Sequence, residues 1–140
     1  MPRKLHPKIR EEVRLRARNL CEYCHTDERW QCVEFTIDHI DPGAGDNIDN
    51  LALACFHCNR RKSDETEFVD AATGEVTTLF NPRSSQWSDH FEWSDDGILI
   101  VPKTQIGRVT LELLDLNRTR ILRIREADAL VGRHPPVEDR

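Results

Sequence analysis

The sequence lacks any long hydrophobic run. None of its apolar stretches approaches the roughly 20 residues that a helix needs to cross a bilayer. The first residues also lack the apolar stretch of a signal peptide. A membrane-spanning chain is therefore excluded by its composition, and we expect a cytoplasmic protein with no membrane partner.

A net positive charge is also missing. The chain has 25 acidic and 20 basic residues and a formal net charge of −5, whereas a nonspecific nucleic-acid coat is normally basic overall. The charges are segregated, and basic residues gather in two groups: Arg3, Lys4, Lys8, Arg10, Arg14, Arg16 and Arg18, and then Arg60, Arg61 and Lys62. Any contact with DNA is expected to be local, and a solvated helix face is the alternative for the first group.

Apolar residues are few for the length of the chain. Hydrophobic residues make up 38% and charged residues 32% of the 140 positions, with a mean hydropathy of −0.62. Such a chain supports one modest domain with a thin core, or a small metal-stabilised module with an attached segment.

Four of the five cysteines form two C-x-x-C pairs, Cys21 with Cys24 and Cys55 with Cys58. A single pair can be a redox motif, but two pairs in a chain expected to be cytoplasmic indicate a metal site more than disulfides. Four thiolates are the usual tetrahedral set for structural zinc, with iron as the alternative. Such a site has no open position, so the metal should hold the fold without taking part in chemistry. Cys32 falls outside the pattern, as a core residue or a free thiol.

The hydrophobic pattern predicts helices and short strands in both halves. The first helix follows from Ile9, Val13, Ala17 and Leu20, and strands are predicted at residues 33–39 and 51–54, with Asp38 pointing away from the core. A loop spans residues 41–47, and a helix runs over 55–62. Further along the chain, the pattern predicts a hairpin that turns at residues 71–74 and a strand at residues 98–101. Trp87, Phe91 and Trp93 are expected in the core, and two helices follow, the second capped by Asn117.

The residues between the cysteine pairs carry a resemblance to a known family. The order C-x-x-C, then D-H-I, then N-L-x-L-x-C-x-x-C-N-x-x-K runs from Cys21 to Lys62 and closely resembles the HNH endonucleases. The resemblance implies an α+β fold, a small zinc-stabilised ββα-metal core with an N-terminal helix and a mixed strand and helix C-terminal extension. We divide the chain into the core (residues 1–66), an extension packed on it (67–132) and a flexible tail (133–140).

The resemblance also implies the roles of individual residues. His39 corresponds to the general base that takes a proton from the attacking water, and imidazole titrates near neutrality. Asp38 corresponds to a ligand of a catalytic Mg²⁺ or Mn²⁺, and Asn50 to the residue that orients the catalytic loop. Asn59 stands where many members have histidine, and an amide oxygen can still bind a hard cation. Residues Arg60, Arg61 and Lys62 are predicted to contact DNA phosphates.

The sequence therefore predicts a metal-dependent endonuclease that hydrolyses phosphodiester bonds in DNA, with double-stranded DNA as the expected partner. The alternative is a zinc-stabilised nucleic-acid-binding module without catalysis, favoured by the negative net charge and Asn59. His57, two residues from Asn59, is expected to face solvent more than metal. Zinc-dependent deamination requires H-x-E and P-C-x-x-C, and it is excluded because the chain has His39-Ile40-Asp41 and Ala54-Cys55 in their place.

Overall fold

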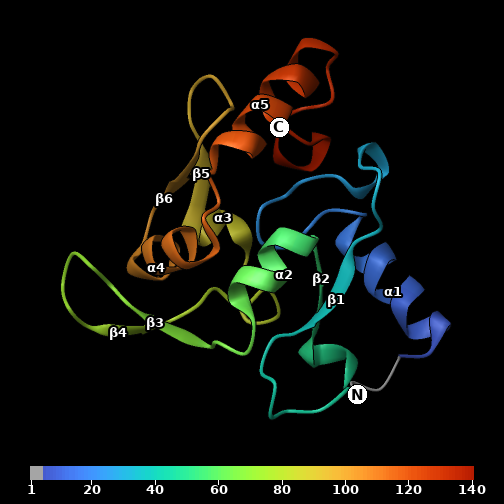
Figure 1. Ribbon diagram of the computed structural model, residues 1–140, viewed down its shortest axis with the longest axis vertical. Helices are drawn as coiled ribbons and strands as arrows, with labels where there is room; N and C mark the ends of the chain where they lie inside the picture. Colours follow the sequence, from blue (N-terminus) through green and yellow to red (C-terminus); the bar gives the residue numbers. More distant parts are fainter. Residues whose placement is uncertain (1–4) are drawn as a thin grey trace. The chain divides into compact units, whose positions relative to one another are not determined.

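The computed structural model describes residues 5–140, so Arg3 and Lys4 lie outside the described residues. Its helices and antiparallel two-stranded sheets make it an α+β protein, as predicted (Figure 1). The chain divides into two compact units between Glu65 and Thr66, whereas the sequence placed the boundary after residue 66. Within the described part of the chain, the helices are all too short or too polar to span a membrane.

Unit 1 begins with α1 (Pro7–Ala17), close to the predicted helix. The Nδ1 atom of His6 accepts a hydrogen bond from the backbone N–H of Lys8, and Pro7 fills the first turn, where its missing N–H costs nothing. The helix ends because Arg18 adopts a left-handed conformation with φ of 55°. A short 3-10 helix, η1 (Glu28–Trp30), follows.

The centre of unit 1 is a hairpin followed by a helix. Strand β1 (Thr36–His39) pairs antiparallel with β2 (Leu51–Ala54), and η2 (Ile48–Asn50) precedes the second strand. Helix α2 (Phe56–Lys62) packs against both strands, and α1 packs against β2. This is the predicted ββα order, although β1 starts three residues later than predicted. The solvent-exposed Val33 explains this difference, because it is not part of the half-buried strand.

The prediction that Asp38 points away from the core is wrong. Its side chain is only 3% exposed, and it lies on the face of β1 that α2 covers. Alternation along the strand placed Asp38 opposite Phe35 and Ile37 correctly, but polar partners enclose this second face as well. The charge is therefore buried among hydrogen-bonding groups.

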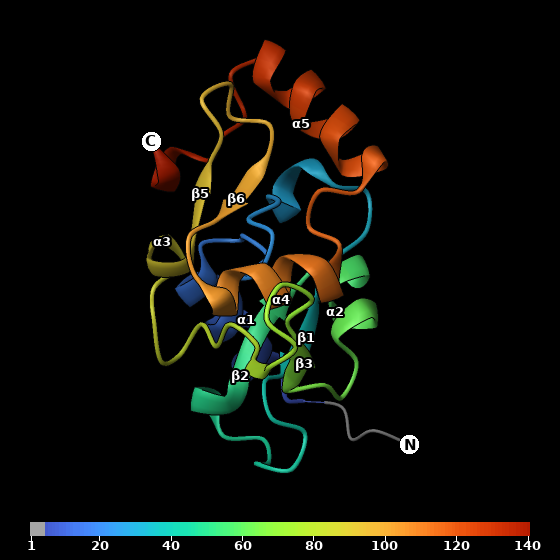
Figure 2. The same ribbon diagram turned by 90° about the vertical axis from the view of Figure 1, so that its left-hand side faces the viewer.

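Unit 2 contains two further hairpins and three helices. Strands β3 (Glu67–Val69) and β4 (Val76–Thr78) form the predicted hairpin, with Gly74 at φ of 76° in its turn. Helix α3 (Trp87–His90) leads into β5 (Phe91–Trp93), which pairs with β6 (Ile100–Pro102). Helix α4 (Gln105–Leu114) packs against β3, β4 and β6, and α5 (Thr119–Leu130) follows it (Figures 1 and 2).

Two predictions for unit 2 differ from the structure. Asn117 is not the cap of α5, since Arg118 holds that position and the Asn117 side chain bonds both the N–H and the carbonyl of Ile100. The C-terminal residues, predicted as a flexible tail, include η3 (Val137–Asp139). There the Trp93 indole donates to Asp139 at 2.9 Å, so a polar segment without apolar period is still tied into the unit.

Candidate metal centre and catalytic groove

The four predicted cysteines meet in one buried cluster. The Sγ atoms of Cys21, Cys24, Cys55 and Cys58 all lie within 4.8 Å of one another, and those of Cys24 and Cys55 are 3.8 Å apart. A tetrahedral site with metal–sulfur bonds of about 2.3 Å has sulfur–sulfur edges of about 3.8 Å. The cluster is therefore positioned to bind a structural metal ion such as zinc, and Cys32 lies outside it as an exposed free thiol.

The electrostatics of the cluster call for a cation. Burial, together with hydrogen bonds to Cys24 and Cys55, raises the pKa of the Cys21 thiol well above its usual range. Several thiolates enclosed without water would repel one another, and a divalent ion removes that cost by binding all four. With four protein ligands no coordination position remains for substrate, so this ion is structural.

The cluster also joins elements that are far apart in sequence. Cys55 is the N-cap of α2, where its Sγ accepts from the N–H of Cys58. Glu22, inside the first C-x-x-C pair, bonds Leu53 of β2 twice: its N–H donates to the Leu53 carbonyl, and its carboxylate accepts from the Leu53 N–H, both at 2.8 Å. The metal site therefore fixes where α2 starts relative to β2.

An open groove lies between the end of β1, the following loop and α2. Its lining includes the predicted site residues Asp38, His39, Asn59 and Arg60, together with Thr36, Ile37, Pro42, Gly45, Asp46, Phe56, Ser63 and Asp64. The structure thus brings the predicted general base and both predicted ligands of the catalytic cation to one depression. The cysteine cluster does not line it, so the two sites are separate.

Asp38 is held by two buried partners. The Tyr23 hydroxyl donates to its Oδ2 at 2.7 Å, and the Lys62 ammonium lies 3.2 Å from the same oxygen. Burial raises the pKa of Asp38, while the charge of Lys62 and the hydrogen bond from Tyr23 oppose that shift. The sequence does not predict this role for Tyr23, because the residue lies inside the first C-x-x-C pair, a pattern that identifies only the two sulfur ligands.

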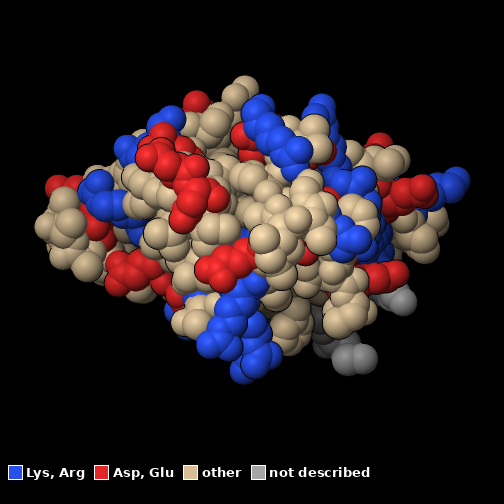
Figure 3. Space-filling model, turned by 90° about the horizontal axis from the view of Figure 1, so that it is seen from above, with Lys and Arg blue, Asp and Glu red and all other residues tan. Residues whose placement is uncertain are grey.

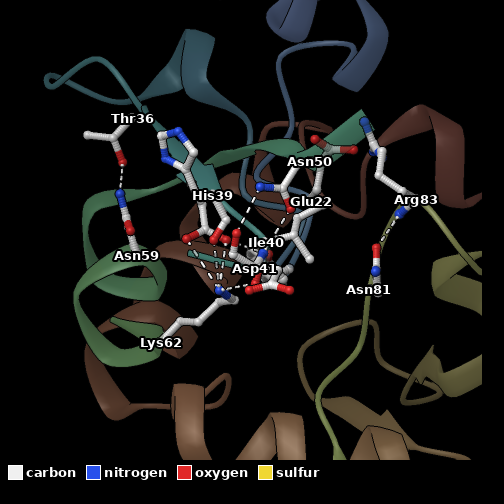
Figure 4. A network of polar contacts seen from close by, with 12 residues as sticks. Glu22, Thr36, His39, Ile40, Asp41, Asn50, Asn59, Lys62, Asn81 and Arg83 are labelled. Carbon is white, nitrogen blue, oxygen red and sulfur yellow. Dashed lines mark hydrogen bonds and ion pairs between the residues drawn. The ribbon is translucent and has the colours of Figure 1, made fainter. Parts of the chain in front are cut away.

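The prediction that Lys62 contacts DNA phosphates is wrong for this structure. Its side chain is 1% exposed, and besides Asp38 the ammonium donates to the carbonyls of Ile40 at 2.9 Å and His39 at 3.3 Å (Figure 4). Lysine carries three N–H donors, and this arrangement satisfies them without water. Lys62 therefore holds the end of β1 and is not part of the surface.

The His39 side chain is about one-third exposed and has a carboxylate partner. Its Nε2 lies 2.7 Å from Oδ1 of Asp46, a residue of the loop between the two strands. In the sequence, Asp46 is one of several turn-forming residues at positions 41–47. The one signal available was an acidic residue seven positions after His39, which does not reveal how the loop folds back.

Asn50 is buried beneath the same loop. Its Oδ1 accepts from the N–H of Asp41, while its Nδ2 donates to the carbonyls of Asp41 and Gly45, all at 2.8 to 2.9 Å (Figure 4). The side chain thus uses both ends of its amide on backbone groups just after His39. This is the bonding expected of a residue that orients the loop.

The other predicted residues lie on α2. The Nδ2 of Asn59 donates to the Thr36 hydroxyl at 2.7 Å, which leaves its Oδ1 as the oxygen donor available to a cation (Figure 4). Arg60 and Arg61 are exposed, and His57 is half-buried and absent from the groove lining. Figure 3 shows one face of the molecule, on which both basic and acidic side chains are exposed.

The metal centre generates a first prediction. Cys55→Ser should remove one thiolate ligand together with the N-cap sulfur of α2, and so unfold unit 1. Structural zinc contributes on the order of 10 kcal/mol to the folding of small modules, more than most domains have in net stability. Elemental analysis of the parent should find one zinc per chain, and circular dichroism should show loss of structure in the variant. A parent that stays folded after complete chelation would contradict this assignment.

The ion pair beneath the groove generates a second prediction. Lys62→Met keeps the length of the side chain but leaves Asp38 buried beside Tyr23 without a cation, so unfolding in urea should require about 3–5 kcal/mol less. Arg60→Met, on the exposed face of the same helix, is the matched control and should change stability by less than about 0.5 kcal/mol. Equal effects of the two substitutions would show that Lys62 is not enclosed as described.

Comparison with known proteins bears on the same segment. Residues 21–65 match the model of a family described as HNH endonuclease. The matched stretch holds all four cysteines, both strands of the β1–β2 hairpin, α2 and the residues of the groove. No curated protein and no solved structure matches the chain. Residues 21–65 are therefore similar to an HNH endonuclease domain, from a family whose members are generally nucleases.

Proposed function

We propose that this protein is a metal-dependent DNA endonuclease that hydrolyses phosphodiester bonds with water activated by His39. The observation that carries the proposal is the groove in the HNH segment, where a partly exposed imidazole lies beside two oxygen-bearing side chains, Asp38 and Asn59. A general base, hard cation ligands and access from solvent are the parts that hydrolysis of a phosphodiester requires.

The donor set of the groove fits a hard divalent cation. Asp38 and Asn59 offer a carboxylate and an amide oxygen, the atoms that Mg²⁺ and Mn²⁺ prefer, and they would hold the ion. When bound, such an ion supplies a positive charge that stabilises the phosphoryl oxygens and the leaving oxygen. The Asn59–Thr36 hydrogen bond orients the amide for this task, because it engages the nitrogen and not the oxygen.

The remaining residues prepare His39 and the substrate. His39 accepts the proton of the attacking water, and Asn50 fixes the backbone of the loop that follows it. Lys62 holds the carbonyls of His39 and Ile40, so that the imidazole leaves the strand in one direction. Arg60, which lines the groove, and Arg61 beside it contact phosphates of double-stranded DNA in this proposal. We place the protein in the cytoplasm.

A binding module without catalysis is the second candidate. The ion pair between Lys62 and Asp38 favours it, because a carboxylate that already faces an ammonium at 3.2 Å binds a metal ion less strongly. The net charge of −5 favours this second candidate only weakly, because a negative charge opposes DNA binding by a nuclease and by a binding module alike. Cleavage of supercoiled plasmid in Mg²⁺ or Mn²⁺, and its absence in EDTA, distinguishes the two candidates.

A third prediction separates catalysis from binding. His39→Ala should slow plasmid cleavage by on the order of 10²–10⁴, the usual contribution of a positioned general base. Zinc content, thermal unfolding and DNA affinity should stay near the parent values, because none of them requires a proton acceptor. His6→Asn is the control, since asparagine also caps a helix and His6 lies outside the groove. Parental cleavage rates for His39→Ala at saturating metal would contradict the assignment.

A fourth prediction concerns the surface arginines. The double substitution Arg60→Ala, Arg61→Ala should weaken binding to unrelated DNA sequences alike and flatten the dependence of affinity on salt, because phosphate contacts release counterions without reading bases. Fluorescence anisotropy across a salt series measures both quantities. Arg120→Ala, Arg123→Ala, an equal change of charge on α5 of unit 2, is the control. An unchanged salt slope would place the DNA path elsewhere, for example along Arg10 and Arg18 on the N-terminal helix.

A further inference from the structure

The loop after β1 delivers a carboxylate to the predicted general base. The Oδ1 of Asp46 lies 2.7 Å from Nε2 of His39, and the two side chains are 36% and 34% exposed. Both residues line the groove. The pair is therefore formed where substrate would bind, and it is accessible from solvent.

This contact restricts the chemistry of the imidazole. An ionised carboxylate only accepts hydrogen bonds, so the neutral ring must carry its hydrogen on Nε2 to satisfy Asp46. The lone pair then lies on Nδ1, which becomes the atom able to take a proton. The ring is also fixed in rotation, because only one orientation directs Nε2 at the carboxylate.

We propose that Asp46 is a positioning residue for His39, which sets its tautomer and its orientation and leaves Nδ1 to accept the proton of water. Once His39 holds that proton, the carboxylate faces an imidazolium and stabilises the charge. The inference rests on the proposed role of His39 as general base, and it adds a residue outside the motif that identifies the family.

The backbone around Asp46 is built to hold it in place. Gly45, directly before it, has φ of 83°, a left-handed conformation that suits glycine, and its carbonyl accepts from Nδ2 of Asn50 at 2.8 Å. Asn50 also holds Asp41 at the start of the loop. The buried asparagine thus acts on the histidine through Gly45 and Asp46, which gives the middle residue of the motif a defined physical task.

The test compares two neighbouring aspartates of the zinc-bound protein. Asp46→Asn removes the charge with little change of shape, and Asp49→Asn makes the same change at an exposed position of η2 outside the groove lining. Asp46→Asn should lower the kcat of plasmid cleavage by between about 10-fold and 10⁴-fold, with KM nearly unchanged. Asp49→Asn should retain the parental kcat.

A spectroscopic readout isolates the tautomer. Long-range ¹H–¹⁵N spectra of the imidazole, recorded without added Mg²⁺ at a pH where the ¹⁵N shifts themselves show a neutral ring, should show the hydrogen of His39 on Nε2 in the parent and in Asp49→Asn. In Asp46→Ala a mixture of tautomers should appear. A loop that merely lost stability would change thermal unfolding and would leave the tautomer of the folded protein unchanged.

Two results would overturn the inference: an Nε2–H tautomer that persists in Asp46→Ala, or a kcat for Asp46→Asn equal to that of Asp49→Asn. In the His39→Ala background, Asp46→Asn should cause no further loss, because the two residues act as a unit. An additional loss there would assign Asp46 a separate role. A parent protein that fails to cleave DNA would contradict the proposed function, and the spectra would still decide whether Asp46 sets the tautomer.

Discussion

Unit 1 depends on one constraint, the gathering of four cysteine sulfurs into one buried cluster that is positioned to bind a metal ion. Apart from the 3-10 helices η1 and η2, the secondary structure described in unit 1 consists of an eleven-residue helix, two four-residue strands and a seven-residue helix, pieces that are too short to be stable alone. The metal centre ties the turn after α1 to the start of α2, and the Glu22–Leu53 hydrogen bonds tie that turn to β2. Everything that lines the groove lies between or just after these tied points.

The buried ion pair between Asp38 and Lys62 extends this fixed arrangement to the groove. Enclosing Asp38 and Lys62 costs the solvation of two charges, and the structure offsets that cost with the Tyr23 hydroxyl and two backbone carbonyls. These buried contacts of Lys62 also restrict how α2 and β1 can move. Because Lys62 holds both the side chain of Asp38 and the carbonyls of the next two residues, α2 and the end of β1 cannot shift independently. His39 therefore leaves a strand end that is fixed on one side by α2 and on the other by Asn50 and its loop.

Sequence reasoning was sufficient where the relevant geometry is local. The spacing of each C-x-x-C pair predicted the metal cluster, and the order of apolar residues predicted the β1–β2 hairpin and α2. Lys62 could also have been placed correctly. Asn59 and Lys62 are three residues apart on a helix, and Thr36 and Asp38 two apart on a strand, so each pair shares one face.

Other parts of the site depend on contacts that no periodicity encodes. Asp46 reaches His39 only because the loop folds back over Asn50, and a string of turn-forming residues does not reveal that path. The same limit explains Asn117, which resembles a helix cap in sequence but is used by Ile100 on a neighbouring strand. The polar composition of the C-terminal residues was also a poor guide. It predicted a flexible tail, whereas the Asp139 carboxylate accepts a hydrogen bond from the indole of Trp93.

The bonds of Asn50 also decide where this protein tolerates an inserted segment. Surface loops normally accept added residues at little cost, because closure entropy grows slowly with length. The loop after His39 is an exception, because the Asn50 side chain bonds the backbone at both Asp41 and Gly45. These bonds can all form only with the present number of residues between the two positions. A residue added between Asp41 and Gly45 would therefore break one of these bonds and move Asp46 away from His39.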